Sequence, residues 1–505
     1  MASSPRTSGA GVRTACATLQ SSAPGLPWTA PTTESPTPGP CAAPPPTSAT
    51  WKRFCDGTST QCPDNTFKKD ETTPCREAIN RCDVADYCTG TQAACAPDNK
   101  ALSGTPCIDE SCSGNIWLPE HTCDGSGACL PPAQTQILCP PYVCNSPTGH
   151  CTTSCQKDAD CTTVCDLRSH QCARGVTDVS CSHDGSTALQ DAIGGCKDFP
   201  CYLRVTDATP CGKISVTDMD IYIVGATIAP ADLGTAVTVV EAGSQTTRLA
   251  LVDVTIRGAY GVDGNGIFAE GTGSSPGHPD LYLNNVTIGS ATTGASNALN
   301  AIAATNTNLV IERSRLISNG GAGIEATKGD LKLDRTLIQY NGHAGIKLTD
   351  TSFQIQNTIV GRNGLTDSAV GVVVTFSSTG LSRIFRFNTV AGNTGGGIVC
   401  NGPTQAATPL LSSLFWNPGT NTFENDRCLD DPSSDIPGGS NACLNTTDTE
   451  LAFESPTLVG ANYHLRGTSP CINKLDCPSD PSSDFDSDSR PQRGPKCDVG
   501  ADEVP

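Results

Sequence analysis

The sequence predicts an all-β protein: a right-handed parallel β-helix, which is a solenoid of stacked coils, preceded by a disulfide-rich, loop-dominated region. Two observations predict this arrangement. Short alternations of apolar and polar residues recur at a fixed interval between residue 212 and about residue 420. Cysteines are unevenly placed, since 21 of the 29 lie from Cys55 to Cys211 and none lies between 212 and 399. The first pattern is typical of strands with one buried face, and the second of small knots held by bridges.

The repeat is clearest in three copies that begin at Leu309, Leu331 and Phe353, 22 residues apart in both steps. Looser copies begin near Leu249, Leu281 and Ile384. A period of 22 is too short for a propeller blade, and the signature and helical back side of a leucine-rich repeat are missing. We therefore expect about three strands in each coil, with adjacent coils about 4.8 Å apart.

Each clear copy also carries an asparagine that glycine follows: Asn319, Asn341 and Asn363. Asparagine and glycine allow the tight corners that such coils need. Because the three residues are one coil apart, we expect their side chains to stack in one corner as a hydrogen-bonded ladder.

Four segments are predicted along the chain. Residues 1–54 are rich in Pro, Ala and Thr, and are expected to be disordered or to belong to a mis-called start. Residues 55–180 are cysteine-rich repeats, and residues 181–470 are the β-helix. Its first coil is expected to be capped by a short amphipathic helix within 184–193. Residues 471–505 are an acidic closing segment.

The cysteines indicate an oxidising compartment, because such density persists as disulfides only there. Zinc sites need spaced CxxC pairs, and the sequence has none. An extracellular or cell-surface location is therefore predicted, although the first 20 residues show no apolar signal-peptide core. We interpret the true start as missing or mis-called. Disulfides are predicted for the cysteines of the first repeats: Cys55, Cys62, Cys75, Cys82, Cys88, Cys95 and Cys107.

Charge and hydropathy narrow the classes of partner. Formal net charge is -19, and no block of Lys and Arg stands out, so nucleic acid is a poor partner. No run of about 18 apolar residues exists, and no membrane span is expected. The predicted partner is an extracellular glycan or surface protein, and the chain is expected to be a monomer.

Residues 75–107 resemble the C-terminal half of disintegrin-like domains, in the core CDVADYCTG and the closing SGTPC. In that family the loop from Cys75 to Cys88 presents an adhesive tripeptide. No Arg-Gly-Asp is present, and the loop reads Asn80-Arg81-Cys82-Asp83. We favour a structural spacer or adhesion stalk over receptor binding.

The C-terminus resembles the closing segment of secreted bacterial β-helix proteins. The matching stretches are Ser469 to Asn473, Asp484 to Pro491 and Asp498 to Glu503. Within it, DFDSDS resembles the start of an EF-hand loop, although Gly and Glu are missing at its later positions. Weak calcium binding by Asp484, Asp486 and Asp488 is a prediction, against the alternative of an acidic surface turn. Calcium is the one cofactor considered.

Two patterns raise the question of catalysis. GHAG around His343 is close to the GHG of polygalacturonase-type hydrolases, but the family's acidic motifs are absent or out of order. His343 is interpreted as a corner residue. In the repeat alignment, Glu312 and Asp334 are equivalent positions one coil apart, and Arg335 adjoins Asp334. These three are the catalytic candidates, although a solvated face with offsetting charges is the favoured interpretation.

The sequence thus favours an exported protein with a non-enzymatic binding, adhesion or structural role. One alternative is a polysaccharide lyase or glycoside hydrolase that acts on a face of the β-helix. The other is a disintegrin-like module that binds a receptor. The sequence does not decide whether the protein is an enzyme, and we favour the interpretation that it is not.

Overall fold

The computed structural model describes residues 69–89, 95, 97–243, 245–272, 278–290, 296–403, 408–417, 428–430, 453–455, 462–477, 481–492 and 495–504. The chain divides into two compact units, one that ends at Thr162 and one that begins at Thr163. The predictions made for residues 1–54, Cys55 and Cys62 lie outside the described residues.

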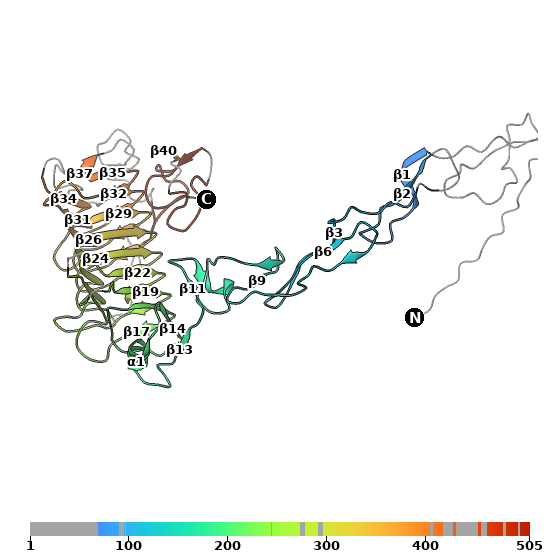
Figure 1. The fold of residues 1–505 in the computed structure, drawn as a ribbon. Coiled ribbons are helices and arrows are strands. Elements are labelled where there is room, and N and C mark those ends of the chain that lie inside the picture. Colours follow the sequence, from blue (N-terminus) through green and yellow to red (C-terminus); the bar gives the residue numbers. More distant parts are fainter. Residues whose placement is uncertain are drawn as a thin grey trace, which may run out of the picture. The chain divides into compact units, whose positions relative to one another are not determined.

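The second unit is a parallel β-solenoid, which confirms the predicted fold class. Its coils stack in chain order, and the strands form three faces that we call sheets A, B and C (Figure 1). Sheet A contains β15 (Ile214–Thr217), β18 (Val237–Val240), β21 (Ile267–Glu270), the first parts of β24 (Ile302–Glu312) and β26 (Ile324–Asp334), β28 (Ile346–Thr349), β31 (Val372–Thr375) and β34 (Ile398–Asn401).

Sheets B and C complete the coils. Sheet B contains β13 (Thr177–Val179), β14 (Cys201–Val205), β16 (Asp220–Val224), β19 (Arg248–Val252), β22 (Asp280–Asn284), the last parts of β24 and β26, β29 (Ser352–Gln356), β32 (Arg383–Arg386), β35 (Thr408–Leu411) and β37 (Cys428–Asp430). Sheet C contains β17 (Thr227–Ile228), β20 (Thr255–Ile256), β23 (Thr287–Gly289), β25 (Arg315–Ile317), β27 (Leu337–Gln339), β30 (Ile359–Gly361), β33 (Thr389–Ala391) and β36 (Leu414–Trp416).

The register agrees with the predicted repeat in the central coils. Leu309 pairs with Leu331, and Leu331 pairs with Phe353, so that one inward column fills the core. All three side chains are buried, and burial of such a side chain stabilises the fold by about 1.5–3 kcal/mol. The next coil is shifted by one residue from the prediction, because Arg383 rather than Ile384 pairs with Phe353. A longer loop after β31 displaces the repeat there.

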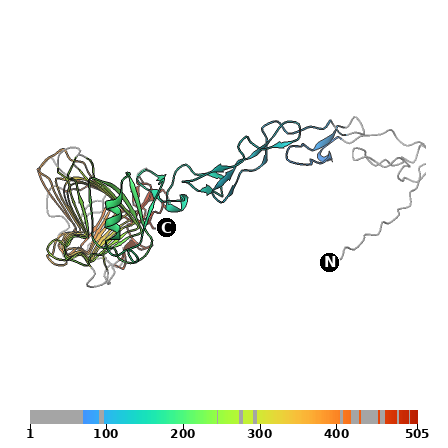
Figure 2. The same cartoon turned by 60° about the horizontal axis from the view of Figure 1, so that its bottom comes forward.

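A short helix lies at the first coil. Helix α1 (Ala188–Gly195) overlaps the predicted range of 184–193 but begins four residues later and ends two residues later, and it buries Leu189 and Ile193 in the apolar core of the solenoid. Figure 2 shows the helix across the near end of the stacked coils. Among the residues that the structure describes, no helix combines the length and the apolar character needed to span a bilayer.

The chain from Phe453 to Val504, which we call the closing segment of the structure, folds back on the last coils and includes the residues predicted from 471 onward. It contains β38 (Phe453–Ser455), β39 (Asn462–Leu465), β40 (Leu475–Asp476) and β41 (Lys496–Cys497). Gly500 N donates to Ser412 O at 3.0 Å, and Ala501 N donates to Thr389 Oγ1 at 3.0 Å. Trp416 is buried and packs with Phe453 and Tyr463 of this segment.

The first unit is built from short antiparallel strands. They are β1 (Lys69–Arg76), β2 (Asp86–Thr89), β3 (Pro106–Ile108), β4 (Ser111–Ser113), β5 (Ile116–Leu118), β6 (His121–Cys123), β7 (Cys129–Leu130), β8 (Ile137–Leu138), β9 (Cys144–Asn145) and β10 (His150–Cys151), followed by the 3-10 turn η1 (Asp158–Asp160). The second unit opens with a similar hairpin of β11 (Cys165–Asp166) and β12 (Gln171–Cys172).

Disulfides join these strands. The bridges in the described part of the first unit include Cys75–Cys95, Cys82–Cys123, Cys107–Cys129, Cys112–Cys144 and Cys139–Cys151. Each spans a loop of 12 to 41 residues. A disulfide-rich region before the solenoid is therefore confirmed. Its bridges join strands of one sheet, as in Cys107–Cys129, and strands of different sheets, as in Cys112–Cys144.

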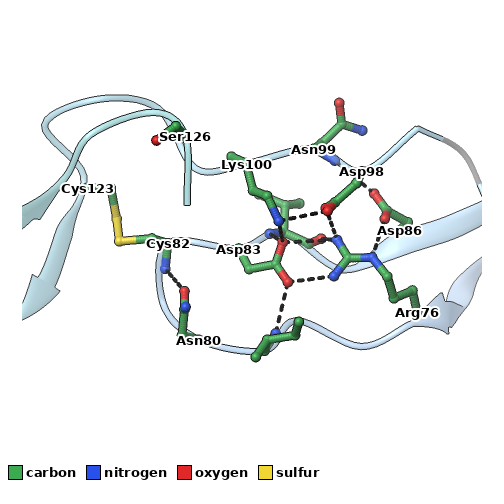
Figure 3. A network of polar contacts seen from close by, with 12 residues as sticks. Arg76, Asn80, Cys82, Asp83, Asp86, Asp98, Asn99, Lys100, Cys123 and Ser126 are labelled. Carbon is green, nitrogen blue, oxygen red and sulfur yellow. Dashed lines mark hydrogen bonds and ion pairs between the residues drawn. A yellow bond between two sulfur atoms is a disulfide. The ribbon is translucent and has the colours of Figure 1, made fainter. Parts of the chain in front are cut away.

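An ionic cluster holds the loop that resembles a disintegrin segment (Figure 3). The Arg76 guanidinium donates to Asp83 at 2.6 Å, to Asp86 at 2.7 Å and to Asp98. Lys100 Nζ donates to Asp83 as well, at 3.1 Å. Within the stretch Asn80-Arg81-Cys82-Asp83, the last two residues are buried, so they cannot be presented to a receptor in this conformation.

Candidate ligand-binding groove on sheet B

The outward side of sheet B carries an open groove of about 240 Å³. Its lining comes from three successive strands, β24, β26 and β29. Outward positions of these strands form two columns along the stack. In the first, Glu312 pairs with Asp334 and Asp334 with Gln356, and in the second, Val310 pairs with Lys332 and Lys332 with Gln354. The predicted alignment of Glu312 with Asp334 is therefore the register of the structure, and the column continues to Gln356.

Glu312 is held from one side only. Its Oε2 accepts hydrogen bonds from Tyr282 Oη and from Asn284 Nδ2, each at 3.0 Å. Burial, together with the negative charge of Glu312, raises the pKa of the Tyr282 phenol, so this hydroxyl stays a donor. Glu312 lines the groove, and its Oε1 has no hydrogen-bond partner among the described residues.

Asp334 is held from both sides. Its Oδ2 accepts a hydrogen bond from Arg335 Nε at 2.8 Å, and its Oδ1 accepts one from Asn357 Nδ2 at 2.9 Å. Arg335 can reach its own neighbour because it occupies a corner with a left-handed backbone, at φ 50°. Its Nη1 also donates to Ser487 Oγ of the closing segment at 3.3 Å. The structure thus brings together Asp334 and Arg335, while Glu312 has separate partners.

Gln356 continues the first column. Its Oε1 accepts hydrogen bonds from Arg386 Nε at 3.1 Å and Arg386 Nη2 at 2.9 Å, and from Gln354 Nε2 at 3.0 Å. Arg386 is the paired position on the following coil. Sequence comparison of the three clear copies missed Arg386 because it lies in the looser copy, and it missed Tyr282 and Asn284 for the same reason.

Lys332 lies on β26, the central strand of the three that line the groove. Its ammonium group makes no hydrogen bond or ion pair with any residue that the structure describes, and its side chain is exposed. A charged donor without an internal partner remains available to a ligand.

The groove is the exposed middle of a longer face. Toward the first coils, the hairpin of β11 and β12 covers sheet B: Tyr222 Oη donates to Cys165 O at 2.9 Å, and Arg168 Nη1 donates to Asp220 at 2.8 Å. Val164 and Ala173 pack on the same outward positions. Toward the last coils, the closing segment contacts Asn357 through Arg490. The open stretch between these two covers is where a ligand can reach the sheet.

His343 lies at a different place. It follows β27 in the turn that leads to β28, and its backbone N donates to Gly321 O at 3.0 Å. Its Nδ1 lies 2.5 Å from Asp367 Oδ2, and both side chains are largely exposed. It does not line the groove. His343 thus lies in a turn between strands, at the corner that the repeat alignment indicated.

The three predicted calcium ligands have different surroundings. Asp484 is buried and accepts backbone hydrogen bonds from Asp488 N at 2.7 Å and from Glu503 N at 2.8 Å. Burial raises the pKa of Asp484 to about 6. Asp486 is half exposed and faces His464, and Asp488 is partly exposed. Calcium binding by these residues stays a prediction.

The asparagine column is longer than the sequence indicated. Nδ2 of Asn319 donates to Oδ1 of Asn341, and Nδ2 of Asn341 donates to Oδ1 of Asn363, each at 2.9 Å. The column continues on both sides, through Asn297, Asn393 and Asn417. Asn393 and Asn417 were missed because coils of 30 and 24 residues break the 22-residue spacing. Asn297 keeps that spacing before Asn319, but Ala298 rather than glycine follows it, so the asparagine-glycine pattern did not include it.

A second buried cluster explains the closing motif. The Arg490 side chain is fully buried; its Nη1 donates to Glu503 Oε2 at 2.9 Å, and its Nη2 donates to Gly500 O and Ala501 O. Its guanidinium carbon lies 4.5 Å from the ring centroid of Phe387. Burial raises the pKa of the Glu503 carboxyl to about 7. In this chain the residues of the closing motif thus attach the tail to the solenoid.

Comparison with known proteins agrees with this architecture. Residues 238–408 match the family described as right handed beta helix region. One similar solved structure is the crystal structure of pectate lyase Pel9A, at 14% sequence identity and a TM-score of 0.38, over 65% of this chain and 96% of that chain. A similarity at this level does not extend to substrate or activity. The chain is thus a parallel β-helix protein with a right-handed β-helix region at residues 238–408 and a disulfide-rich region before it.

Proposed function

We propose that the protein binds a polysaccharide in the groove on sheet B. The observation that carries the proposal is a set of three polar groups with unused hydrogen-bonding capacity on three adjacent coils: Glu312 Oε1, Lys332 Nζ and Gln354 Oε1. A ligand that repeats along its length suits a surface that repeats along the solenoid axis. Sugar hydroxyls can donate to the two oxygens and accept from the ammonium group.

Neighbouring side chains hold two of these groups in place in the absence of a ligand. Glu312 is fixed by Tyr282 and Asn284, and Gln354 donates to Gln356. The partners are therefore oriented before a ligand arrives, which reduces the entropy lost on binding. The partly buried ring of Tyr282 and the side chain of Val310 pair on adjacent coils and supply apolar contact beside them.

Binding is tested by titrating the whole protein with neutral and acidic polysaccharides, for example xylan and polygalacturonate, in affinity electrophoresis. On whichever polymer retards the wild type, Lys332→Met is expected to weaken binding about tenfold, because a hydrogen bond to a charged donor contributes about 1.5–3 kcal/mol. Lys347→Met is the matched control, since Lys347 is an exposed outward residue of sheet A that pairs with Glu325 at 2.8 Å.

The control must bind as the wild type does. Failure of every polymer to retard a folded sample, or equal weakening by the two substitutions, would rule out this groove as the polysaccharide site.

Cleavage of the bound polymer is the second candidate, favoured by one observation. Glu312 and Asp334 place two carboxylates on adjacent coils in the same groove, and paired carboxylates are what glycoside hydrolysis requires. The test is the release of reducing ends from the same panel, with and without calcium. Release that Glu312→Gln abolishes while binding persists would establish catalysis.

We propose an extracellular location for this activity. Five bridges in the first unit and the bridges Cys181–Cys211, Cys196–Cys201, Cys400–Cys428 and Cys477–Cys497 in the second support it. Bridges of this number persist in oxidising surroundings. Mass spectrometry of free thiols in the native protein tests the location, since a cytoplasmic protein would carry reduced cysteines.

A further inference from the structure

The closing segment contains a cluster of ligand-type atoms that lies outside the groove. His464 of β39, Asp486 of the turn after Phe485, and Asp502 near the end of the chain each direct one atom to a common point. His464 Nδ1 lies 3.1 Å from Asp486 Oδ2 and 3.2 Å from Asp502 Oδ1. The three atoms all lie within 4.8 Å of one another.

We propose that His464, Asp486 and Asp502 bind one divalent transition-metal ion, with zinc as the best fit. Zinc takes histidine nitrogen and carboxylate oxygen at about 2.0–2.2 Å in a tetrahedral arrangement. Ligand atoms around such an ion lie about 3.3–3.6 Å apart. The two distances from His464 Nδ1 are about 0.1–0.2 Å below that range, and the two carboxylate oxygens lie within 4.8 Å of each other, so rotation of the side chains is needed to bring all three ligands to one ion.

The rest of the structure orients the three ligands. Asp502 is buried, and its Oδ2 accepts a hydrogen bond from Leu465 N at 2.7 Å, which leaves Oδ1 for the ion. The His464 ring packs edge-on against Phe485, with ring centroids 5.4 Å apart. Hydrogen bonds and packing contacts that fix the orientation of the coordinating side chains are typical of metal sites.

Ligand chemistry separates this site from a calcium loop. Calcium takes six to eight oxygen ligands, whereas this cluster offers one nitrogen and two carboxylates. Asp486 is half exposed, so a fourth position at the ion is open to water. Of the three residues in the predicted calcium loop, the proposed site includes only Asp486.

A metal ion here would join three parts of the closing segment. His464 lies in β39, Asp486 in the turn that starts at Asp484, and Asp502 in the tail that pairs with the last coils. Carboxylates also outnumber cations in this segment, where Asp484, Asp498 and Glu503 surround the single buried arginine. A divalent cation would offset that excess charge.

The test is isothermal titration of the whole oxidised protein, first treated with EDTA, with zinc chloride. The wild type is expected to bind one ion, and zinc is expected to raise its melting temperature because the ion binds the folded state. Asp486→Asn is expected to weaken zinc binding by at least about tenfold. Asp486 is half exposed, so this variant should fold. Asp488→Asn, two residues away, is the matched control and should bind zinc as the wild type does.

Three results would overturn the proposal. The first is a folded wild type that takes up no zinc. The second is zinc binding that Asp486→Asn leaves unchanged, since the ion would then lie elsewhere. The third is calcium binding, in place of zinc, that Asp488→Asn weakens, which would assign the turn to the predicted calcium loop.

Discussion

The two units of this chain are stabilised by different interactions. In the solenoid, inward columns such as Leu309, Leu331 and Phe353 build a continuous apolar core, and buried asparagines connect one coil to the next. In the described part of the first unit, strands have two to eight residues and the buried apolar cluster consists of cysteines. A unit of this kind buries too little apolar surface to fold without covalent bridges.

This difference in stabilisation indicates which unit can carry a ligand-binding surface. A solenoid whose core is closed by backbone and asparagine ladders can vary its outward positions without loss of stability. Sheet B uses that freedom to carry Glu312, Lys332 and Gln354. In the first unit, charged side chains such as Arg76 and Asp83 are instead used to hold loops. We therefore expect the ligand on the solenoid.

Reduction of the disulfides should have the largest effect, because it should unfold the first unit and leave the strands of the solenoid folded. A bridge typically contributes about 2–4 kcal/mol, so the loss of five should unfold residues 97–161 completely. Residues 212–399 have no cysteine and should keep their strands. Hydrogen exchange in the presence of a reductant measures both. Loss of protection in β24 to β30 at the same reductant concentration would show that the two units are not independent in this respect.

A change at the closing segment should have the next largest effect. Arg490→Met leaves Glu503 buried without its partner, and removal of one member of a buried pair costs about 3–5 kcal/mol. Arg466→Met, an exposed arginine of the same segment, is the control and should cost under about 1 kcal/mol. Urea unfolding of the two variants gives the comparison. Equal midpoints would mean that the tail does not stabilise the solenoid.

The asparagine ladder should contribute somewhat less. Asn341→Ala removes the acceptor of Asn319 N and Asn319 Nδ2, both buried, and should cost about 2–4 kcal/mol. Asn308→Ala removes one hydrogen bond to Asp280 on the outward side and should cost under about 1 kcal/mol. Thermal unfolding by circular dichroism ranks the two. The opposite ranking would mean that the core alone determines stability.

The smallest effect on stability is expected in the groove. Lys332→Met removes no internal hydrogen bond, so the free energy of unfolding should change by less than about 0.5 kcal/mol. The same urea titration measures it. A larger loss would mean that Lys332 is part of the scaffold, and it would remove the distinction between structural and ligand-binding positions on sheet B.

The sequence predicted what depends on local periodicity. The alignment of Glu312 with Asp334, and the three central asparagines, follow from equal coil lengths, so a 22-residue period was enough to find them. Asn393 and Arg386 lie beyond longer coils, where the period fails. The contact of Arg335 with Ser487 joins positions 152 residues apart, and no local pattern indicates it. No local pattern indicates that the β11–β12 hairpin covers sheet B either, because the residues in contact are more than 50 positions apart.

The most direct test of the account is carboxyl footprinting of the whole protein with a carbodiimide and an amine, read by mass spectrometry, with and without the bound polysaccharide. We predict that the ligand reduces labelling of Glu312 several-fold and leaves Glu325, an outward carboxylate of sheet A, unchanged. Protection at Glu325, or at Glu110 of the first unit with Glu312 unprotected, would contradict the assignment of the ligand to the groove on sheet B.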